Sequence, residues 1–503
     1  MQNNQNLYAV LVSRWPDAGV ALIDESGVAI TYAALDEMAA RTAAALRGLG
    51  VGPGDRITAQ IEKSAQGAAL YLASLRIGAV FNPLNTAYTP AELDYFVGDA
   101  EPAVCVATPD RAEALRGRDA MRGVAIETLD AKGHGSLAEK AAAAAPWRDI
   151  AVSSADDLAA ILYTSGTTGR SKGAMITHGN LVSNTEALHA AWRFEAGDVL
   201  LHALPIYHVH GLFVALGTAL YNGSSILWLP KFDAAQAVSL LPRATVMMGV
   251  PTFYTRLLDH PDFNAALVKH MRLFVSGSAP LLAETHRAFE ARTGHRIIER
   301  YGMTETGMIT TNPYDGERVP GSVGYPLPGV SVRIAGDDGA EQPTGEPGVI
   351  EVRGPNVFKG YWRMPEKTRA EFRDDGYFIT GDIGVAAEDG RIRIVGRAKD
   401  LIISGGFNVY PKEIEDEIDA LPGVVESAVI GAPHPDFGEG VVAVVATKGA
   451  ALSEGEVIGA LKDRLAKFKL PKRVFFVDDL PRNAMGKVQK AELRQIYQNV
   501  FRA

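Results

Sequence analysis

The sequence predicts an α/β fold in which a large N-terminal region is followed by a smaller α+β C-terminal domain. From residue 31 to residue 254, helical patterns alternate with short apolar strand patterns, which is typical of α/β layers with largely parallel sheets. After about Gly321, short β-type segments alternate with turns rich in Gly, Pro and Asp, which indicates a small twisted sheet or barrel. From Arg397 the pattern is compact again over roughly 100 residues, enough for an independent domain. We therefore predict domains over residues 1–396 and 397–503.

Local signals predict the first elements of the N-terminal region. Thr31 is expected to cap a helix whose apolar face runs from Leu35 to Leu49, and Gly50 is expected to close it. Further along the chain, we expect a strand at 55–61, a helix at 64–77 and a strand at 79–81.

The second half of the chain is predicted to begin with short strands at 331–334, 349–352, 377–380 and 392–395. Pro411 is expected to open a helix that ends near Leu421. Strands are expected at 424–430, 441–446 and 473–477, and Ser453 is expected to cap a helix that runs to about Lys467.

Composition restricts the class of protein. The 503 residues are 47% apolar and 22% charged, an ordinary globular balance that excludes a disordered chain. Lys and Arg number 50 against 59 Asp and Glu, so the net charge is −9, which argues against nonspecific nucleic-acid binding. The single cysteine, Cys105, excludes an intrachain disulfide and fits a reducing cytoplasm. Neither a signal peptide nor a membrane-spanning helix is expected.

The strongest local motif covers residues 163–173. Three glycines and five Ser or Thr hydroxyls form a loop suited to wrapping phosphate oxygens, and Lys172 adds a positive charge. A strand is expected before the loop and a helix from about His178 after it. A Walker-type P-loop does not fit, because Ser171 stands where its second Gly is required and Gly173 follows the lysine. A solvated turn is the structural alternative.

Four weaker segments follow in order. The segment 301–305 offers Glu305 as a carboxylate for Mg²⁺, and 377–382 ends in an acid that could bind ribose hydroxyls. The segment 390–411 holds two basic residues and a double glycine, and 483–490 holds Lys487. Taken singly, each also fits a structural role such as a helix cap, a turn, a hairpin or a surface charge.

Together, these five motifs resemble the adenylate-forming superfamily of acyl-CoA synthetases, luciferases and peptide-synthetase adenylation domains, over essentially the whole chain. The resemblance implies two α/β subdomains plus a small β-rich subdomain, followed by a mobile C-terminal domain. It also implies ATP, Mg²⁺ and coenzyme A as ligands, and no acid–base dyad is required.

The resemblance assigns roles residue by residue. The β- and γ-phosphates of ATP are expected to contact Thr164, Ser165, Gly166, Thr167, Thr168, Gly169 and Lys172. The rest of the nucleotide is expected to contact Tyr301 at the base, Thr304 at phosphate, and Asp382 and Arg397 at the ribose. Glu305 is expected to bind Mg²⁺, His208 to orient the substrate carboxylate, Lys487 to be the catalytic lysine and Lys399 the hinge. The pantetheine tunnel is expected to be lined by Ser404, Gly405 and Phe407.

Two departures from the common pattern indicate the acid. In the segment 205–211, His210 stands where relatives often have an aromatic residue, and Arg300 stands where relatives with bulky apolar acids often have Gly. A buried guanidinium needs a partner, and a second carboxylate on the substrate would bind it bidentately. Ser276 and Ser278 could add hydroxyl donors. The combination is similar to that of members acting on malonate, and often on methylmalonate.

Structural alternatives remain for both residues. Arg300 could form an internal salt bridge with Glu299 or another nearby acid, and His210 could be a satisfied core histidine. A zinc site built from His202, His208 and His210 is disfavoured, because no carboxylate or thiolate nearby completes it.

We therefore expect an ATP-dependent ligase that joins malonate to coenzyme A through an acyl-AMP. Another small acid, or a carrier protein as the acceptor, remain alternatives. A regulatory nucleotide-binding protein is disfavoured by the intact Lys487, Glu305 and Asp382. Acylation of Lys487 by an acetyltransferase is expected to switch the activity off, because it removes the charge.

Overall fold

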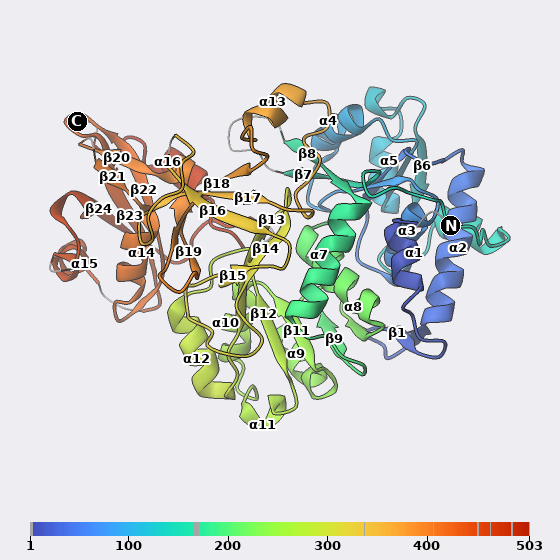
Figure 1. Ribbon diagram of the computed structural model, residues 1–503, viewed down its shortest axis with the longest axis horizontal. Helices are drawn as coiled ribbons and strands as arrows, with labels where there is room; N and C mark the ends of the chain where they lie inside the picture. The colour runs from blue at the N-terminus through green and yellow to red at the C-terminus, as the bar shows by residue number, and fades with distance from the viewer. Residues whose placement is uncertain are drawn as a thin grey trace.

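Two large, mainly parallel sheets form the N-terminal region of the computed structural model, which describes residues 4–164, 171–336, 338–405, 407–449, 452–462, 464–483 and 486–501. Figure 1 shows this region at one end of the molecule and the C-terminal unit at the other, with β16–β19 near the C-terminal unit. The predicted α/β class is confirmed.

The first sheet has the strand order β6-β5-β3-β4-β7-β8, and all neighbours are parallel except the antiparallel pair β7–β8. Its strands are β3 (Arg56–Gln60), β4 (Val80–Pro83), β5 (Val104–Ala107), β6 (Ala125–Thr128), β7 (Leu158–Thr164) and β8 (Lys172–Thr177). The helices in this part of the chain are α1 (Leu7–Val12), α2 (Tyr32–Gly48), α3 (Ala65–Arg76), α4 (Pro90–Ala100), α5 (Pro109–Leu115) and α6 (Ser136–Ala143).

The second sheet has the order β15-β14-β13-β12-β11-β9-β10-β1-β2, and its central strands are parallel. Its strands are β1 (Val20–Ile23), β2 (Ala29–Thr31), β9 (Val199–His202), β10 (Ser225–Trp228), β11 (Val246–Gly249), β12 (Leu273–Ser276), β13 (Ile298–Met303), β14 (Gly307–Thr311) and β15 (Tyr325–Pro326). The helices between them are α7 (His178–Ala191), α8 (Gly217–Asn222), α9 (Ala234–Leu240), α10 (Pro251–Asp259), α11 (Ala265–Val268) and α12 (Ala283–Thr293).

A four-stranded antiparallel sheet follows, as the β-rich segment predicted. Its strands are β16 (Ser331–Ala335), β17 (Gly348–Arg353), β18 (Phe378–Ala386) and β19 (Ile392–Arg397), with α13 (Pro365–Ala370) between the second and third. The C-terminal unit contains β20 (Ile402–Ser404), β21 (Phe407–Val409), α14 (Pro411–Asp419), β22 (Val424–His434), β23 (Gly438–Thr447), α15 (Glu454–Leu461), β24 (Arg473–Val477) and α16 (Lys490–Tyr497). The boundary at residue 397 stays a prediction.

Local capping explains why the early helices were predictable. The Thr31 side chain accepts a hydrogen bond from the Ala34 N–H at 3.1 Å, and the Ser64 side chain accepts one from Gly67 at 3.0 Å. Each side chain satisfies a backbone donor that the first turn of a helix leaves free.

The strand expected before the phosphate loop and the helix expected from about His178 are confirmed as β7 and α7. The strand β8, which lies between the loop and α7 and pairs antiparallel with β7, was not predicted. One expectation is corrected. The helix capped by Ser453 ends at Leu461 rather than Lys467. A 3₁₀ turn at Lys467–Lys469 follows, and Leu470 is extended because it precedes Pro471.

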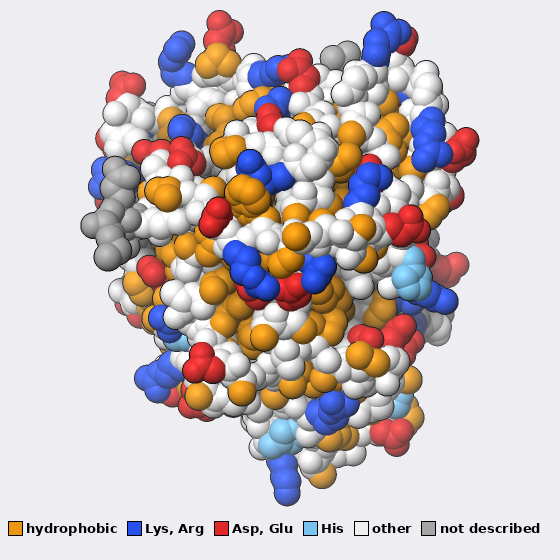
Figure 2. Space-filling view, turned by 90° about the vertical axis from the view of Figure 1, so that its right-hand side faces the viewer, with side chains coloured by type: hydrophobic (Ala, Val, Ile, Leu, Met, Phe, Trp, Pro, Cys, Tyr) orange, Lys and Arg blue, Asp and Glu red, His pale blue; other side chains and the backbone are white. Residues whose placement is uncertain are grey.

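Basic and acidic side chains are interspersed over the face shown in Figure 2, without a large area of one sign. None of the helices in the described ranges combines the length and apolar character needed to cross a bilayer.

Candidate active site

The expected ribose-binding residues meet at one point of the small sheet. Pairing of β18 with β19 sets Asp382 opposite Arg397, and the Arg397 Nε lies 2.6 Å from Asp382 Oδ1. The Tyr301 hydroxyl donates to Asp382 Oδ2 at 2.5 Å. Burial and the adjacent carboxylate raise the pKa of Tyr301, so this hydroxyl keeps its proton and remains a donor. Three residues from distant motifs therefore form one cluster, in which Tyr301 and Asp382 are buried and Arg397 is partly exposed.

Glu305 lies in the turn between β13 and β14 and is 5% exposed. Its carboxylate lies 3.1 Å from the Tyr361 hydroxyl, which is also 2.6 Å from Glu371 Oε2. Glu371 in turn accepts a hydrogen bond from the Lys172 ammonium at 3.1 Å. Lys172 also lies 4.1 Å from the centre of the Tyr361 ring. This network joins the first motif to the second through Tyr361 and Glu371, which were not selected from the sequence.

The environment of Glu305 fits a magnesium ion. Mg²⁺ in nucleotide sites is typically held by one or two carboxylates together with substrate phosphates. Burial raises the pKa of Glu305, and a cation beside it would favour the ionised form. Across the described ranges there is no group of three or more His, Cys, Asp or Glu arranged to hold a metal by protein ligands alone.

Arg300 lies on β13 and is 4% exposed, and its Nε and Nη2 have no hydrogen-bond partner. It forms no ion pair within the described residues. The neighbouring Glu299 accepts instead from the Gly321 N–H at 3.0 Å, so the internal salt bridge with Glu299 is absent. Burial lowers the pKa of Arg300 to about 9. The strand thus holds a guanidinium that nothing in the described chain neutralises.

The space beside Arg300 is made by a glycine. A Cβ at Gly277 would lie 2.3 Å from the Arg300 Cζ, so a larger residue there would force the Arg300 guanidinium to move. Gly277 follows Ser276, whose buried Oγ has no partner, and precedes Ser278, which has φ +72°. β12 and β13 are parallel, so these residues lie where their carboxyl ends meet, the usual place for a ligand in such a sheet.

The two histidines of the segment 205–211 lie beside this group. His210 is buried, its Nδ1 is 3.1 Å from Ser278 Oγ, and its Nε2 has no partner. It is therefore not a fully satisfied core histidine. Burial, and then the charges of Arg300 and Lys487, lower the pKa of His208 to about 4, so His208 is neutral near pH 7.

Lys487 belongs to a loop that reaches the N-terminal region. Its N–H donates to Asn483 Oδ1 at 3.0 Å, and a Cβ at the adjacent Gly486 would lie 3.5 Å from Thr252 Oγ1 at the start of α10. The side chain is exposed along part of its length, yet burial within the cleft and the nearby Arg397 lower its pKa to about 8.

Other expected site residues lie outside these clusters. Phosphate-loop residues Ser165, Gly166, Thr167, Thr168 and Gly169 lie outside the described residues. Thr164 ends β7, Thr304 lies in the turn that holds Glu305, and Lys399 lies in a 3₁₀ turn after β19. The expected tunnel residues Ser404, Gly405 and Phe407 lie at the β20–β21 hairpin, where Phe407 is 56% exposed and stacks on Phe468.

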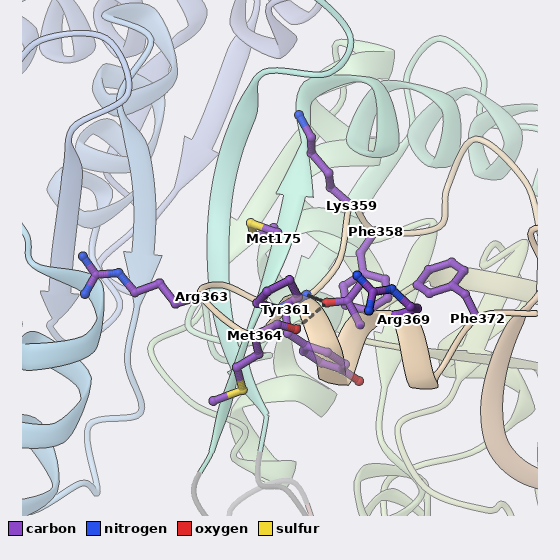
Figure 3. Close-up of a pocket in the computed structure, with 10 residues that line it drawn as sticks. Met175, Phe358, Lys359, Tyr361, Arg363, Met364, Arg369 and Phe372 are labelled. Carbon is purple, nitrogen blue, oxygen red and sulfur yellow. Dashed lines mark hydrogen bonds between the residues drawn. The ribbon is translucent and has the colours of Figure 1, made fainter.

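A cavity of about 590 Å³ lies beside α13. Figure 3 shows that Lys359 and Arg363 at its rim point away from one another. Its lining is mainly apolar and includes Met175, Phe358 and Phe372. The cavity touches the candidate site only at Tyr361. It is therefore not the acid pocket, by which we mean the space beside Arg300, His208 and His210.

Tyr361, Glu371 and Gly277 are the site residues that the sequence did not single out by role. Gly277 stood inside a quoted Ser-Gly-Ser segment, which could have indicated a close approach of another group. Nothing local marks Tyr361 or Glu371, because their role arises from contacts with Glu305 and Lys172, at 56 and 199 positions along the chain.

Comparison with known proteins identifies the family. The AMP-binding enzyme family matches residues 10–362, and the AMP-binding enzyme C-terminal domain matches residues 413–487. The chain is 57% identical to MatB from Rhodopseudomonas palustris, over 99% of this chain and 100% of that one, with a TM-score of 0.97 for its ATP-bound crystal structure. For apo MatB, at the same 57% identity, the TM-score is 0.87.

Two curated relatives differ in the acid they are named for. The mitochondrial malonate–CoA ligase ACSF3 of Mus musculus is 39% identical over 84% of this chain and 79% of its own length. A sulfoacetate–CoA ligase of Cupriavidus necator is 36% identical over 97% of this chain and 96% of its own. Both are CoA ligases, as the resemblance implied. The chain belongs to the AMP-binding enzyme family and is an AMP-forming acid–thiol ligase.

Proposed function

We propose that the enzyme is a malonate:CoA ligase that also accepts methylmalonate. The observation that carries this proposal is the unpaired, buried guanidinium of Arg300. Its Nε and Nη2 groups have no partner, and the nearby buried His210 Nε2 is also unpaired. A carboxylate at the far end of a short diacid would satisfy these groups. Ser276 pairs with Glu299 in the β12–β13 register, so its side chain is on the opposite face of the sheet from Arg300 and is not part of this group. Relatives named as malonate–CoA ligases support the same choice.

In the first half-reaction, a carboxylate oxygen of malonate attacks the α-phosphorus of ATP, and pyrophosphate leaves. Negative charge accumulates where carboxylate and phosphate meet. Lys487 supplies positive charge there, while neutral His208 orients the carboxylate without adding charge. Glu305 would hold Mg²⁺, which supplies charge neutralisation at the phosphates when bound. Asp382, Arg397 and Tyr301 hold the nucleoside.

In the second half-reaction, the thiol of coenzyme A attacks the acyl carbon and AMP leaves. In this arrangement of the two domains, Lys487 lies close to Arg397 and His208. The thiol therefore needs a second arrangement, in which Lys487 has left this position. We infer that a C-terminal domain beginning at residue 397 turns about Lys399 and brings Ser404, Gly405 and Phe407 to the thiol path. The exposed Phe407 ring, and the different TM-scores to ATP-bound and apo MatB, support such a movement.

The cellular context is part of the same proposal. We place the enzyme in the cytoplasm, because its one cysteine is buried and suits a reducing compartment. We expect an acetyltransferase to be able to silence it through Lys487, whose charge the first half-reaction needs.

Pyrophosphate release tests the substrate. The purified enzyme is assayed with ATP, Mg²⁺ and coenzyme A against mono- and dicarboxylic acids of two to five carbons, with sulfoacetate included because its sulfonate is also a second anion. Malonate should have the highest kcat/KM, with methylmalonate next. A higher value for sulfoacetate, propionate or succinate would refute the choice of acid. Turnover only with a carrier protein in place of coenzyme A would refute the choice of acceptor.

A further inference from the structure

Lys63 is a buried amine that the adenylation chemistry does not use, and burial lowers its pKa well below the usual value. It lies two residues before α3 and is 5% exposed. Its Nζ lies 2.7 Å from His202 Nδ1 and 2.7 Å from the His202 carbonyl oxygen, and 4.2 Å from the centre of the Trp228 ring. Where the structure describes the chain, no carboxylate pairs with it. Burying an amine without a counter-ion costs free energy of folding. A functional role for its hydrogen bonds to His202 would explain why this cost is tolerated.

The protonation of His202 follows from its two partners. Its Nε2 lies 2.8 Å from the Gly211 carbonyl oxygen, which can only accept, so Nε2 bears the proton. Nδ1 is then a bare acceptor, and Lys63 must be its donor. Burial, and then the charge of Lys63, hold the pKa of His202 well below its usual range. Lys63 thus fixes His202 as the neutral Nε2–H tautomer.

Gly211 ends the segment that contains both histidines of the acid pocket. A Cβ at Gly211 would lie 2.0 Å from the Pro205 carbonyl oxygen, so the two ends of the segment are in close contact. The next residue along the chain, Leu212, donates its N–H to the His208 carbonyl at 2.9 Å. A π-helical turn, His210–Leu216, begins at the end of the segment, a geometry often found at functional sites. Within the described residues, the hydrogen bond from His202 Nε2 is the side-chain contact that holds the Gly211 carbonyl in place.

We propose that Lys63 and His202 are positioning residues that hold the 205–211 segment so that His208 and His210 face the acid. The hydrogen-bond chain runs from the Lys63 Nζ, which donates to His202 Nδ1, through the His202 ring to the Gly211 carbonyl. It links the first sheet's β3–α3 connection to the end of β9 in the second sheet. The inference rests on the proposed function, because it takes His208 and His210 to face the acid.

The test replaces the hydrogen bonds while keeping the packing. In Lys63→Met combined with His202→Phe, neither side chain is left with an unpaired polar atom, so the protein should still fold. His202→Gln should rescue, because an amide can accept from Lys63 and donate to Gly211. His178→Gln is the matched control, since His178 is another buried histidine, bonded to the Leu7 N–H at 3.1 Å, outside the acid pocket.

We expect the double variant to lose about ten-fold or more in kcat/KM for malonate, through a raised malonate KM, with the KM for ATP unchanged. His202→Gln should stay within about three-fold of the parent enzyme, and His178→Gln should match it. Nitrogen NMR should show a neutral Nε2–H imidazole at His202 from about pH 6 to pH 8.

Three results would overturn the inference. They are a folded double variant with unchanged malonate KM, a His202→Gln variant as impaired as the double variant, and a protonated or Nδ1–H imidazole at His202. Failure of the proposed function is distinguishable, because it would appear in the parent enzyme as poor activity with malonate.

Discussion

Replacing Arg300 with methionine tests the acid pocket directly. Methionine fills a similar volume and removes the guanidinium whose Nε and Nη2 are unpartnered. A hydrogen bond to a charged group contributes about 1.5–3 kcal/mol, so losing two amounts to about 3–6 kcal/mol. That corresponds to a loss of about 10²- to 10⁴-fold in kcat/KM for malonate. Propionate has no second carboxylate, so its kcat/KM should stay the same or rise.

The assay follows pyrophosphate release at saturating ATP and coenzyme A while each acid is varied. Arg76→Met is the matched control, because Arg76 is also buried but is paired with Asp36 and bonded to the Arg148 carbonyl at 2.8 Å. This control should lower the melting temperature and leave the malonate-to-propionate ratio of kcat/KM unchanged. Equal losses with malonate and propionate in Arg300→Met would refute Arg300 as the anchor.

The melting temperature of Arg300→Met gives a second, independent test of whether Arg300 has an internal partner. Burial lowers the pKa of Arg300 to about 9, so the charged form destabilises the ligand-free fold. That penalty is full below about pH 9 and declines as the pH rises from there towards the unfolded pKa of 12.5. The melting temperature of Arg300→Met at pH 7 should therefore equal or exceed that of the parent, and a marked decrease would indicate that Arg300 has an internal partner.

Further predictions concern Lys487 and Glu305. Lys487→Ala should abolish adenylate formation and largely spare thioester formation from premade malonyl-AMP. Equal losses in the two half-reactions would contradict the proposal that the C-terminal domain adopts a different arrangement for each. In the parent enzyme, kcat/KM for adenylation should fall as the pH rises through about 8, because Lys487 loses its proton, and a flat profile would argue against its charge being used. Enzyme acetylated at Lys487 should be inactive in adenylation, so full activity would reject the switch. Tyr361→Phe removes one partner of Glu305 and should raise the Mg²⁺ concentration needed for half-maximal adenylation about ten-fold, with an unchanged malonate KM.

Local chemistry determined which elements of the fold were predictable. The helix begun by Thr31 was predicted because its cap and apolar face lie within a few residues of each other. The strand β8 was not predicted, because Lys172–Thr177 becomes a strand only by pairing with β7 across the phosphate loop. Strand formation of this kind depends on a partner rather than on the segment itself.

The candidate site likewise contains residues that were predictable from the sequence and residues that were not. Asp382 and Arg397 were predicted from a motif resemblance, and the structure sets them in one cluster with Tyr301. Lys63 and Tyr361 were not predicted, because each gains its role from a group more than 50 positions away in the sequence. An unpaired buried charge is visible only when every neighbour is known, which is why the structure, and not the pattern, identifies Arg300 as lacking an internal partner.

The net charge of −9 supports the argument that the unpaired Arg300 guanidinium selects the acid. A dianionic substrate gains no long-range attraction from such a protein, so binding must come from positive charge held locally. In the proposed function Arg300 supplies it, and in the described chain it has no internal carboxylate to release before the acid enters. A monoacid would bury an apolar end against a guanidinium that stays unsatisfied. Sites built to hydrogen-bond a substrate group reject analogues that lack it by about 10⁴-fold or more. Discrimination against propionate therefore arises chiefly from what the monoacid leaves unpaired.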